Sequence, residues 1–178
     1  MRTGSDPRGL VYQGMPTMRC HLPGTGRPLI RKHNDAEYFH QPNEINVWLP
    51  VTRTFGAHGR SGLANDLSRC VFTTMSRCAS GSNTLWAESA PGAGDFHPFS
   101  CEGERDGVGE CVLFWGNQCL HYTLPNDTDT TRVSIDFRVV PRSYYQTVYK
   151  DCLRLDGQPR FSLGAYYDET GSETGSDL

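Results

Sequence analysis

The chain has 178 residues and a formal net charge of −3, with 37% hydrophobic and 11% aromatic residues. This length allows one domain with a hydrophobic core. The small negative charge gives no reason to expect nucleic acid or an anionic membrane as a partner. No apolar run reaches the length of a membrane span, and the first residues lack the apolar core of a signal peptide, which favours a cytoplasmic protein.

The domain is predicted to cover residues 15–167, after a flexible lead-in at 1–14 and before a disordered acidic tail at 168–178. Residues 57–80 are rich in Ser, Arg and Thr and show little periodicity. Omitting them joins two segments into a plausible strand–turn–strand unit. We therefore interpret 57–80 as a loop insertion, which a sheet scaffold tolerates well.

The seven cysteines are odd in number and form no Cys-x-x-Cys pair. Neither a disulfide framework nor a structural zinc site is indicated, and we expect buried free thiols. Cys119 lies two residues before His121, but no base is evident beside it, so packing is favoured over a catalytic thiol.

Short strand patterns recur along the chain, and the clearest lies at 131–140. There the polar residues Arg132, Ser134, Asp136 and Arg138 alternate with Val133, Ile135, Phe137 and Val139. Further strands are predicted at 16–23, 44–52, 83–89 and 111–115, with a short helix at 143–153. With 19 Gly and 11 Pro favouring turns, the fold class is all-β with minor helices, arranged as a double-sheet jelly roll.

His33 and Asp35 form a His-x-Asp pair near the start of the domain. Residues two apart share a face of an extended chain, so this imidazole and carboxylate can reach one point in space. Such a pair needs a third ligand to form a facial site for non-haem Fe(II). Downstream, ten residues separate His121 from Arg132, and Arg132-x-Ser134 places a guanidinium and a hydroxyl on one strand face. A polar inward face in a double sheet predicts a ligand cavity.

The combined pattern of His33-x-Asp35, a distal His121 and Arg132-x-Ser134 resembles the Fe(II)/2-oxoglutarate-dependent oxygenases. Within them, residues 33–48 look like the metal segment of the phytanoyl-CoA dioxygenase type. The stretches E-I-N-V-W-L-P-V-T, N-T-L-W-A-E-S, G-N-Q-C-L-H-Y-T and N-D-T-D-T-T-R-V-S-I-D-F-R-V-V-P are similar to a narrower group, the streptomycin-biosynthesis-like proteins. The resemblance covers residues 11–145 apart from the insertion.

The resemblance implies a double-stranded β-helix, cupin-like in architecture, in which His33, Asp35 and His121 hold Fe(II). It also implies that 2-oxoglutarate binds through Arg132 and Ser134, because a planar guanidinium matches a carboxylate. Asn46, on the inward face, is a further candidate contact to 2-oxoglutarate or substrate. Dioxygen would take the last iron position, and a small-molecule substrate would be oxidised with release of succinate and CO2. Only 32 residues precede His33, fewer than such enzymes often have, so a minimal core or a fragment is expected.

Two other interpretations stay open. One is a cupin-like metal enzyme that uses His40, Glu44 and His121 without 2-oxoglutarate. The other is a non-catalytic β-sandwich binding protein that keeps the scaffold. A separate interpretation of the residues places Arg132 and Arg138 on a solvated strand face, where they pair with Asp136. The sequence indicates neither the identity of the substrate nor the oligomeric state.

Overall fold

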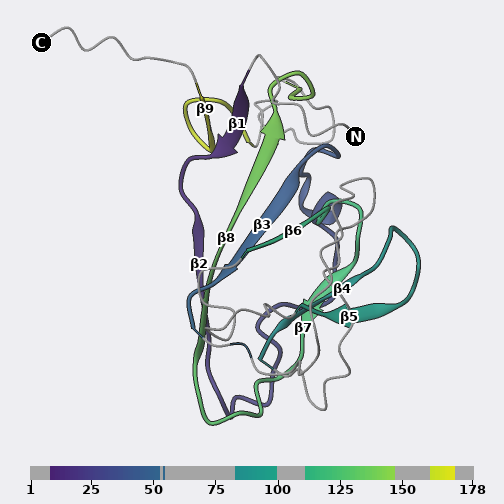
Figure 1. Cartoon of the computed structure of the whole chain (residues 1–178), viewed down its shortest axis with the longest axis vertical. Helices are drawn as coiled ribbons and strands as arrows, with labels where there is room; N and C mark the ends of the chain where they lie inside the picture. The colour runs from purple at the N-terminus through teal and green to yellow at the C-terminus, as the bar shows by residue number, and fades with distance from the viewer. Residues whose placement is uncertain (1–8, 53, 55–82, 100–110, 147–160, 171–178) are drawn as a thin grey trace, which may run out of the picture.

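The protein is described by a computed structural model over residues 9–52, 54, 83–99, 111–146 and 161–170 (Figure 1). These residues form nine strands and one short 3-10 helix, so the predicted all-β, cupin-like fold class is confirmed. In this part of the chain, no helix is long and apolar enough to cross a membrane. The elements are β1 (Leu10–Gln13), β2 (Thr17–His21), η1 (Asp35–Tyr38), β3 (Ile45–Pro50), β4 (Leu85–Glu88), β5 (Phe96–Pro98), β6 (Val112–Phe114), β7 (His121–Thr123), β8 (Arg132–Pro141) and β9 (Tyr167–Glu169).

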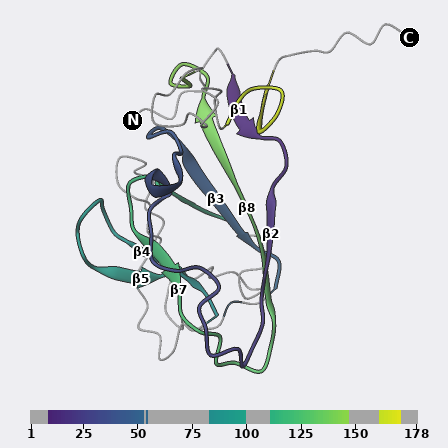
Figure 2. The ribbon, with the colours of Figure 1, turned by 180° about the vertical axis from the view of Figure 1, so that it is seen from behind.

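The strands form two antiparallel sheets, visible as two layers from both sides of the molecule (Figures 1 and 2). The larger sheet has the order β6-β3-β8-β1-β9, and β2 also pairs with β8. The smaller sheet has the order β5-β4-β7. The strand β8 is long enough to pair with β3 along one edge and with β2 and then β1 along the other.

The apolar core lies where the two sheets meet. It contains Trp48 from β3, Leu85 and Ala87 from β4, and Val112 and Phe114 from β6, with Phe99 beside them. Because β3 and β6 belong to the larger sheet and β4 to the smaller one, this cluster joins the layers. Side chains packed between two sheets in this way are the usual core of a sandwich.

The inner face of β8 is polar, as the alternation in the sequence predicts. Arg132, Ser134, Asp136 and Arg138 are buried, whereas the apolar residues between them are only partly buried. The same alternation on β2 turns Arg19 and His21 inward and leaves Met18 exposed. The interpretation of a solvated β8 face is therefore wrong, and its polar groups need partners within the protein.

Several boundaries differ from the prediction. Residues 10–13 form β1, so this part of the predicted flexible lead-in is ordered by pairing with β8 and β9. The strand β9 extends into the predicted tail, and β5 lies where no strand was predicted. The proposed insertion at 57–80 lies outside the described residues, as does residue 147 onward of the predicted 143–153 helix.

The cysteines also differ from expectation. Cys20 and Cys111 are free, but both are exposed rather than buried. Cys119 is buried and disulfide-bonded, so the prediction of a free thiol is wrong there. The spacing alone carried no information about this bond, because a disulfide depends on which Cα atoms the fold brings together.

Candidate metal site and cavity

The backbone places His33 and His121 directly opposite each other. Each donates its N–H to the carbonyl oxygen of the other, at 3.1 Å from His33 N and 2.8 Å from His121 N. Residues that face each other in an antiparallel pair have their side chains on the same side of the sheet. The two imidazole rings accordingly lie side by side, with centroids 4.4 Å apart.

Asp35 enters the same site from the first turn of η1. Asn34 is the N-cap in extended conformation, and a capping box with Glu37 fixes the start of this helix. The Asp35 N–H also donates to the Gly116 carbonyl oxygen at 2.7 Å, which attaches the turn to the loop between β6 and β7. The extended geometry expected for His33-x-Asp35 therefore ends at Asn34, yet the carboxylate still faces the histidines.

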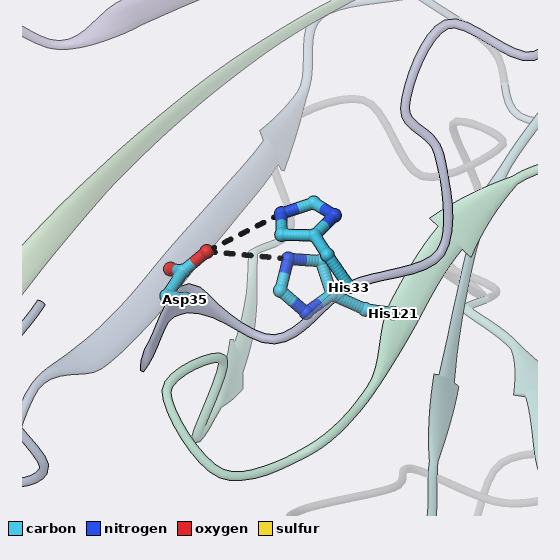
Figure 3. A group of neighbouring side chains, drawn as sticks. All are labelled: His33, Asp35 and His121. Carbon is cyan, nitrogen blue, oxygen red and sulfur yellow. Dashed lines mark ion pairs between the residues drawn. The ribbon is translucent and has the colours of Figure 1, made fainter. Parts of the chain in front are cut away.

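The three side chains converge on one point (Figure 3). One ligand atom from each of His33, Asp35 and His121 lies within 4.8 Å of the other two. Asp35 Oδ1 is 3.5 Å from His33 Nε2 and 3.6 Å from His121 Nε2. All three residues are buried, and within the described ranges no other group of His, Cys, Asp or Glu side chains has this arrangement.

Hydrogen bonds fix which nitrogen each histidine offers. His33 Nδ1 lies 2.6 Å from the Arg31 carbonyl oxygen, and His121 Nδ1 lies 3.0 Å from that of Cys119. A carbonyl oxygen only accepts, so both Nδ1 atoms carry a proton, and in the neutral ring Nε2 is then the atom that presents a lone pair to the site. Burial lowers the pKa of His121 to about 4, which keeps this ring neutral near pH 7.

The local carboxylate raises the affinity of the neighbouring histidine for a proton. Burial disfavours the charged form of His33 and lowers its pKa. The hydrogen bonds of His33 to Asp35 and to the Arg31 carbonyl oxygen outweigh the effect of burial, so the pKa of His33 is raised. Conversely, the pKa of Asp35 is held well below its usual range despite burial, chiefly by His33 and Arg138. Asp35 is thus a carboxylate near pH 7, with negative charge available to a cation.

The second carboxylate oxygen of Asp35 is occupied by three N–H donors. Asn46 Nδ2 donates to Oδ2 at 2.7 Å, and Arg138 donates from Nε at 3.0 Å and Nη2 at 2.8 Å. Arg138 is itself held by Gln13 Oε1 at 3.3 Å and the Tyr166 hydroxyl at 3.2 Å. Oδ2 is therefore engaged with the protein, and Oδ1 is the atom directed at the histidines.

These residues line a cavity of about 480 Å³ between the sheets. Its wall carries the three candidate ligands together with cationic, aromatic and apolar side chains from both layers. The other lining residues are Arg19, Leu29, Ile30, Arg31, Tyr38, His40, Asn46, Trp48, Leu85, Phe114, Asp136, Arg138, Phe161 and Tyr166.

Arg132 and Ser134 lie next to this cavity but do not line it. Both side chains have 0% exposure, and Arg132 Nη1 donates to Ser134 Oγ at 2.7 Å. The Arg132 Cζ atom lies 5.4 Å from the ring centroid of Trp48, which does line the cavity. Burial lowers the pKa of Arg132 to about 10, and among the described residues no carboxylate forms an ion pair with it.

The alternative cupin-like set is not assembled. His40 pairs with Glu44 at 2.8 Å, and Glu44 also accepts from the Tyr167 hydroxyl at 2.5 Å and the Gln41 N–H at 2.8 Å. The described residues show the metal-type cluster only at His33, Asp35 and His121. Glu44 is thus part of a buried hydrogen-bond network around β9, with His40 stacked on Phe161.

Sequence reasoning missed the role of three residues at the site. From the sequence, Arg138 had a role only in the alternative of a solvated pair with Asp136, whereas Asp136 pairs with Arg19 at 2.5 Å. Arg138 instead binds Asp35, which lies 103 positions away in the chain. Gln13 comes from the predicted lead-in, and Tyr166 from the end of the predicted domain, where no strand was predicted. The polar residue at every second position of β8 was the sequence signal that Arg138 points inward, but this pattern did not identify Asp35 as the partner of Arg138.

Comparison with known proteins found similarity to the streptomycin biosynthesis protein StrG of Streptomyces griseus, at 30% identity over 165 residues. The match covers 93% of this chain and 63% of StrG, so the chain spans less than two thirds of that relative. No protein-family model matches the sequence. A solved structure described as a non-heme monooxygenase, the ThoJ–Ni complex, aligns with a TM-score of 0.46 and 15% identity. That alignment covers 75% of this chain and 45% of the other.

Proposed function

We propose that the protein is an Fe(II)- and 2-oxoglutarate-dependent dioxygenase of the phytanoyl-CoA dioxygenase type that oxidises a small molecule. The observation that carries this proposal is the buried convergence of two imidazoles and one carboxylate on the cavity wall. A set of two histidines and one carboxylate, with further positions open, is the ligand arrangement of non-haem Fe(II) oxygenases.

The donor set fits Fe(II) in its chemistry. In their neutral state, His33 and His121 each present the lone pair of Nε2, and Asp35 presents Oδ1 while Arg138 and Asn46 hold Oδ2. In this role the bound iron supplies O2 activation, coupled to conversion of 2-oxoglutarate to succinate and CO2, with the second oxygen atom available to the substrate. The protein's own groups fix the ligand atoms, and the partly apolar wall around them limits access of water.

Arg132 and Ser134 are the proposed site for the distal carboxylate of 2-oxoglutarate. A fully buried guanidinium without a carboxylate partner is costly, and an anionic ligand removes that cost. Asn46, by contrast, donates its Nδ2 to Asp35. Its proposed role therefore moves from contacting 2-oxoglutarate to orienting a metal ligand.

A small-molecule substrate agrees with the size of the cavity, since small-molecule sites typically measure about 300 to 1,000 Å³. The similarity to a streptomycin biosynthesis protein supports an enzyme of small-molecule biosynthesis. It does not specify a substrate, because a scaffold of this kind serves many reactions.

The test is an anaerobic titration of the metal-free protein with Fe(II) and then 2-oxoglutarate, followed by visible absorption. We expect a metal-to-ligand charge-transfer band in the wild type. The His121→Ala variant should lose the band because one of the three ligands is gone. His97→Ala is the matched control, since His97 lies on β5 outside the cavity wall and should leave the band unchanged.

The other outcomes identify the alternatives. Iron binding without the band would overturn the use of 2-oxoglutarate and favour a cupin-like metal enzyme. Absence of iron binding would overturn the metal site itself and favour a non-catalytic binding protein.

A further inference from the structure

Near the proposed carboxylate site, three buried nitrogen atoms have no hydrogen-bond partner among the residues that the structure describes. They are His21 Nε2, Trp48 Nε1 and Arg132 Nε. The side chains of these residues and Ser134, here called the Arg132 cluster, are at most 2% exposed. An N–H buried without an acceptor costs about 1–3 kcal/mol, so several around one guanidinium indicate a missing acceptor.

The pairing of β2 with β8 explains why His21 belongs to this cluster. His21 lies directly opposite Arg132 in the antiparallel register, so both side chains project from the same face. The two side chains contact each other, with Arg132 Nη2 and His21 Nδ1 3.4 Å apart. Asn126 fixes the backbone at this position by donating to the His21 carbonyl oxygen at 2.9 Å.

This contact determines the tautomer of His21. A guanidinium nitrogen only donates, so His21 Nδ1 must be the acceptor. A neutral imidazole with an accepting Nδ1 carries its proton on Nε2, which is the atom without a partner. Burial and the charge of Arg132 lower the pKa of His21 to about 4, so the ring is neutral near pH 7.

The charges around the cluster favour an anion as the missing acceptor. Within the described residues Arg132 has no ion-pair partner, because the nearby Asp136 is bound by Arg19 at 2.5 Å and 3.2 Å. A neutral imidazole adds a donor without adding a second positive charge that would repel the guanidinium. Donors from Arg132, Ser134 and His21 together suit the two oxygen atoms of a carboxylate.

We propose that His21 is a specificity-determining residue whose Nε2–H donates to the terminal carboxylate that Arg132 and Ser134 bind. In assigning this carboxylate to 2-oxoglutarate, the inference rests on the proposed function. His21 then selects a 2-oxo dicarboxylic acid over a 2-oxo acid with an apolar end, because only the former satisfies its buried donor.

The experiment compares two ligands of equal chain length, 2-oxoglutarate and 2-oxopentanoate, which has a methyl group in place of the distal carboxylate. Affinities are measured anaerobically in the Fe(II) protein from the charge-transfer band. For His21→Leu we expect the Kd of 2-oxoglutarate to rise about 10- to 100-fold, the worth of one hydrogen bond to a charged group. The Kd of 2-oxopentanoate should change less than about twofold, the usual scatter for a distant substitution.

His21→Gln is the conservative variant, because its amide N–H extends to the region of Nε2. It should restore most of the affinity for 2-oxoglutarate, and His97→Leu should leave both affinities unchanged. Equal losses for the two ligands in His21→Leu would mean a structural role and overturn the proposal. An unchanged Kd for 2-oxoglutarate, or a glutamine variant no better than the leucine variant, would overturn it as well.

Failure of the proposed function is recognisable separately, as absence of the band in the wild type. In that case the His21 proposal is judged in the metal-free protein by titration with glutarate. The His21 ring signals are followed by NMR and assigned by their loss in His21→Gln. A saturable shift that is absent from the other histidines supports a carboxylate site at His21, and unchanged signals overturn it.

Discussion

The two oxygen atoms of Asp35 have different surroundings, and Arg138 causes most of the difference. Arg138 supplies two of the three donors to Oδ2, while Oδ1 faces the histidines. Its buried guanidinium also stabilises the ionised carboxylate before any cation binds. Residues that orient a metal ligand in this way commonly affect metal affinity as strongly as some ligands do.

Replacing Arg138 with methionine should therefore weaken metal binding. The long apolar side chain keeps much of the packing but removes both donors to Asp35. We expect the affinity for Fe(II), or for Co(II) as a spectroscopic substitute, to fall about 10- to 100-fold. Anaerobic calorimetry measures the affinity. The visible spectrum of bound Co(II) reports the coordination of the metal, and a loss of protein stability alone does not change this spectrum.

Arg142→Met is the matched control for this substitution. Arg142 forms an ion pair of similar length with Glu169, at 2.8 Å, but both side chains are about one third exposed. Exposed pairs contribute about 0–1 kcal/mol, so metal affinity should stay at the wild-type value. Equal metal affinity in the Arg138 and Arg142 variants would show that Arg138 does not position Asp35.

Among the elements, the strands with strict alternation were predictable from the sequence. On β8 and β2, polar residues recur at every second position, and the structure turns these residues inward. The short strands β1, β5 and β9 carry too few residues for such a pattern, and β1 and β9 also pair with strands distant in the chain. The pair of His33 and Asp35 was predicted from its spacing, and His121 as the third ligand from the resemblance to a known family. The residues that orient them were not, because the contact from Arg138 to Asp35 depends on the completed sheet.

Gly116, in the loop between β6 and β7, is a second residue whose role depends on contacts with segments distant in the chain. A Cβ atom there would lie 2.6 Å from Asn46 Cγ, closer than real Cβ contacts. The Gly116 carbonyl oxygen also accepts from the Asp35 N–H. Only a residue without a side chain therefore lets the loop hold Asp35 while Asn46 reaches its carboxylate.

Gly116→Ala should consequently destabilise the protein by about 1–3 kcal/mol, the usual range for overpacking a buried site. In the Asn46→Ala background the clashing amide is absent, so the same change should cost much less. Urea unfolding of the two single variants and the double variant gives the coupling free energy. Strictly additive effects would contradict a clash between these two residues.

Trp48 on β3 lines the cavity and also contacts Arg132, with the Arg132 Cζ atom 5.4 Å from its ring centroid. Because Arg132 is fully buried, a carboxylate that binds it from the cavity is expected to change the surroundings of the indole. We expect 2-oxoglutarate to change the tryptophan fluorescence of the anaerobic Mn(II)-loaded wild type. The change should be absent in Trp48→Phe, which keeps the other two tryptophans. A signal unaffected by this substitution would exclude a change in the surroundings of Trp48.

At the scale of the whole molecule, the space between the sheets buries charge as well as apolar surface. Arg19 with Asp136 and Arg138 with Asp35 form ion pairs there, whereas Arg132 has only neutral partners among the described residues. Buried groups that resist protonation make the stability of a protein depend on pH, because the unfolded chain binds protons that the folded chain does not. His21 and His121 are such groups, each with its pKa lowered to about 4.

The sign of this dependence follows from the shift of His21. Its pKa is 6.5 in the unfolded reference and about 4 in the folded protein, so between these values the unfolded state binds more protons. The free energy of unfolding should therefore fall as the pH drops from about 6.5 to 4, by up to about 1.4 kcal/mol per pH unit for this group. His21→Gln removes the contribution of His21 and leaves that of His121, so the variant should lose less stability over this window. Urea unfolding of both proteins at pH 7.5 and 4.5 measures the difference, and parallel losses would show that His21 is not a buried neutral imidazole.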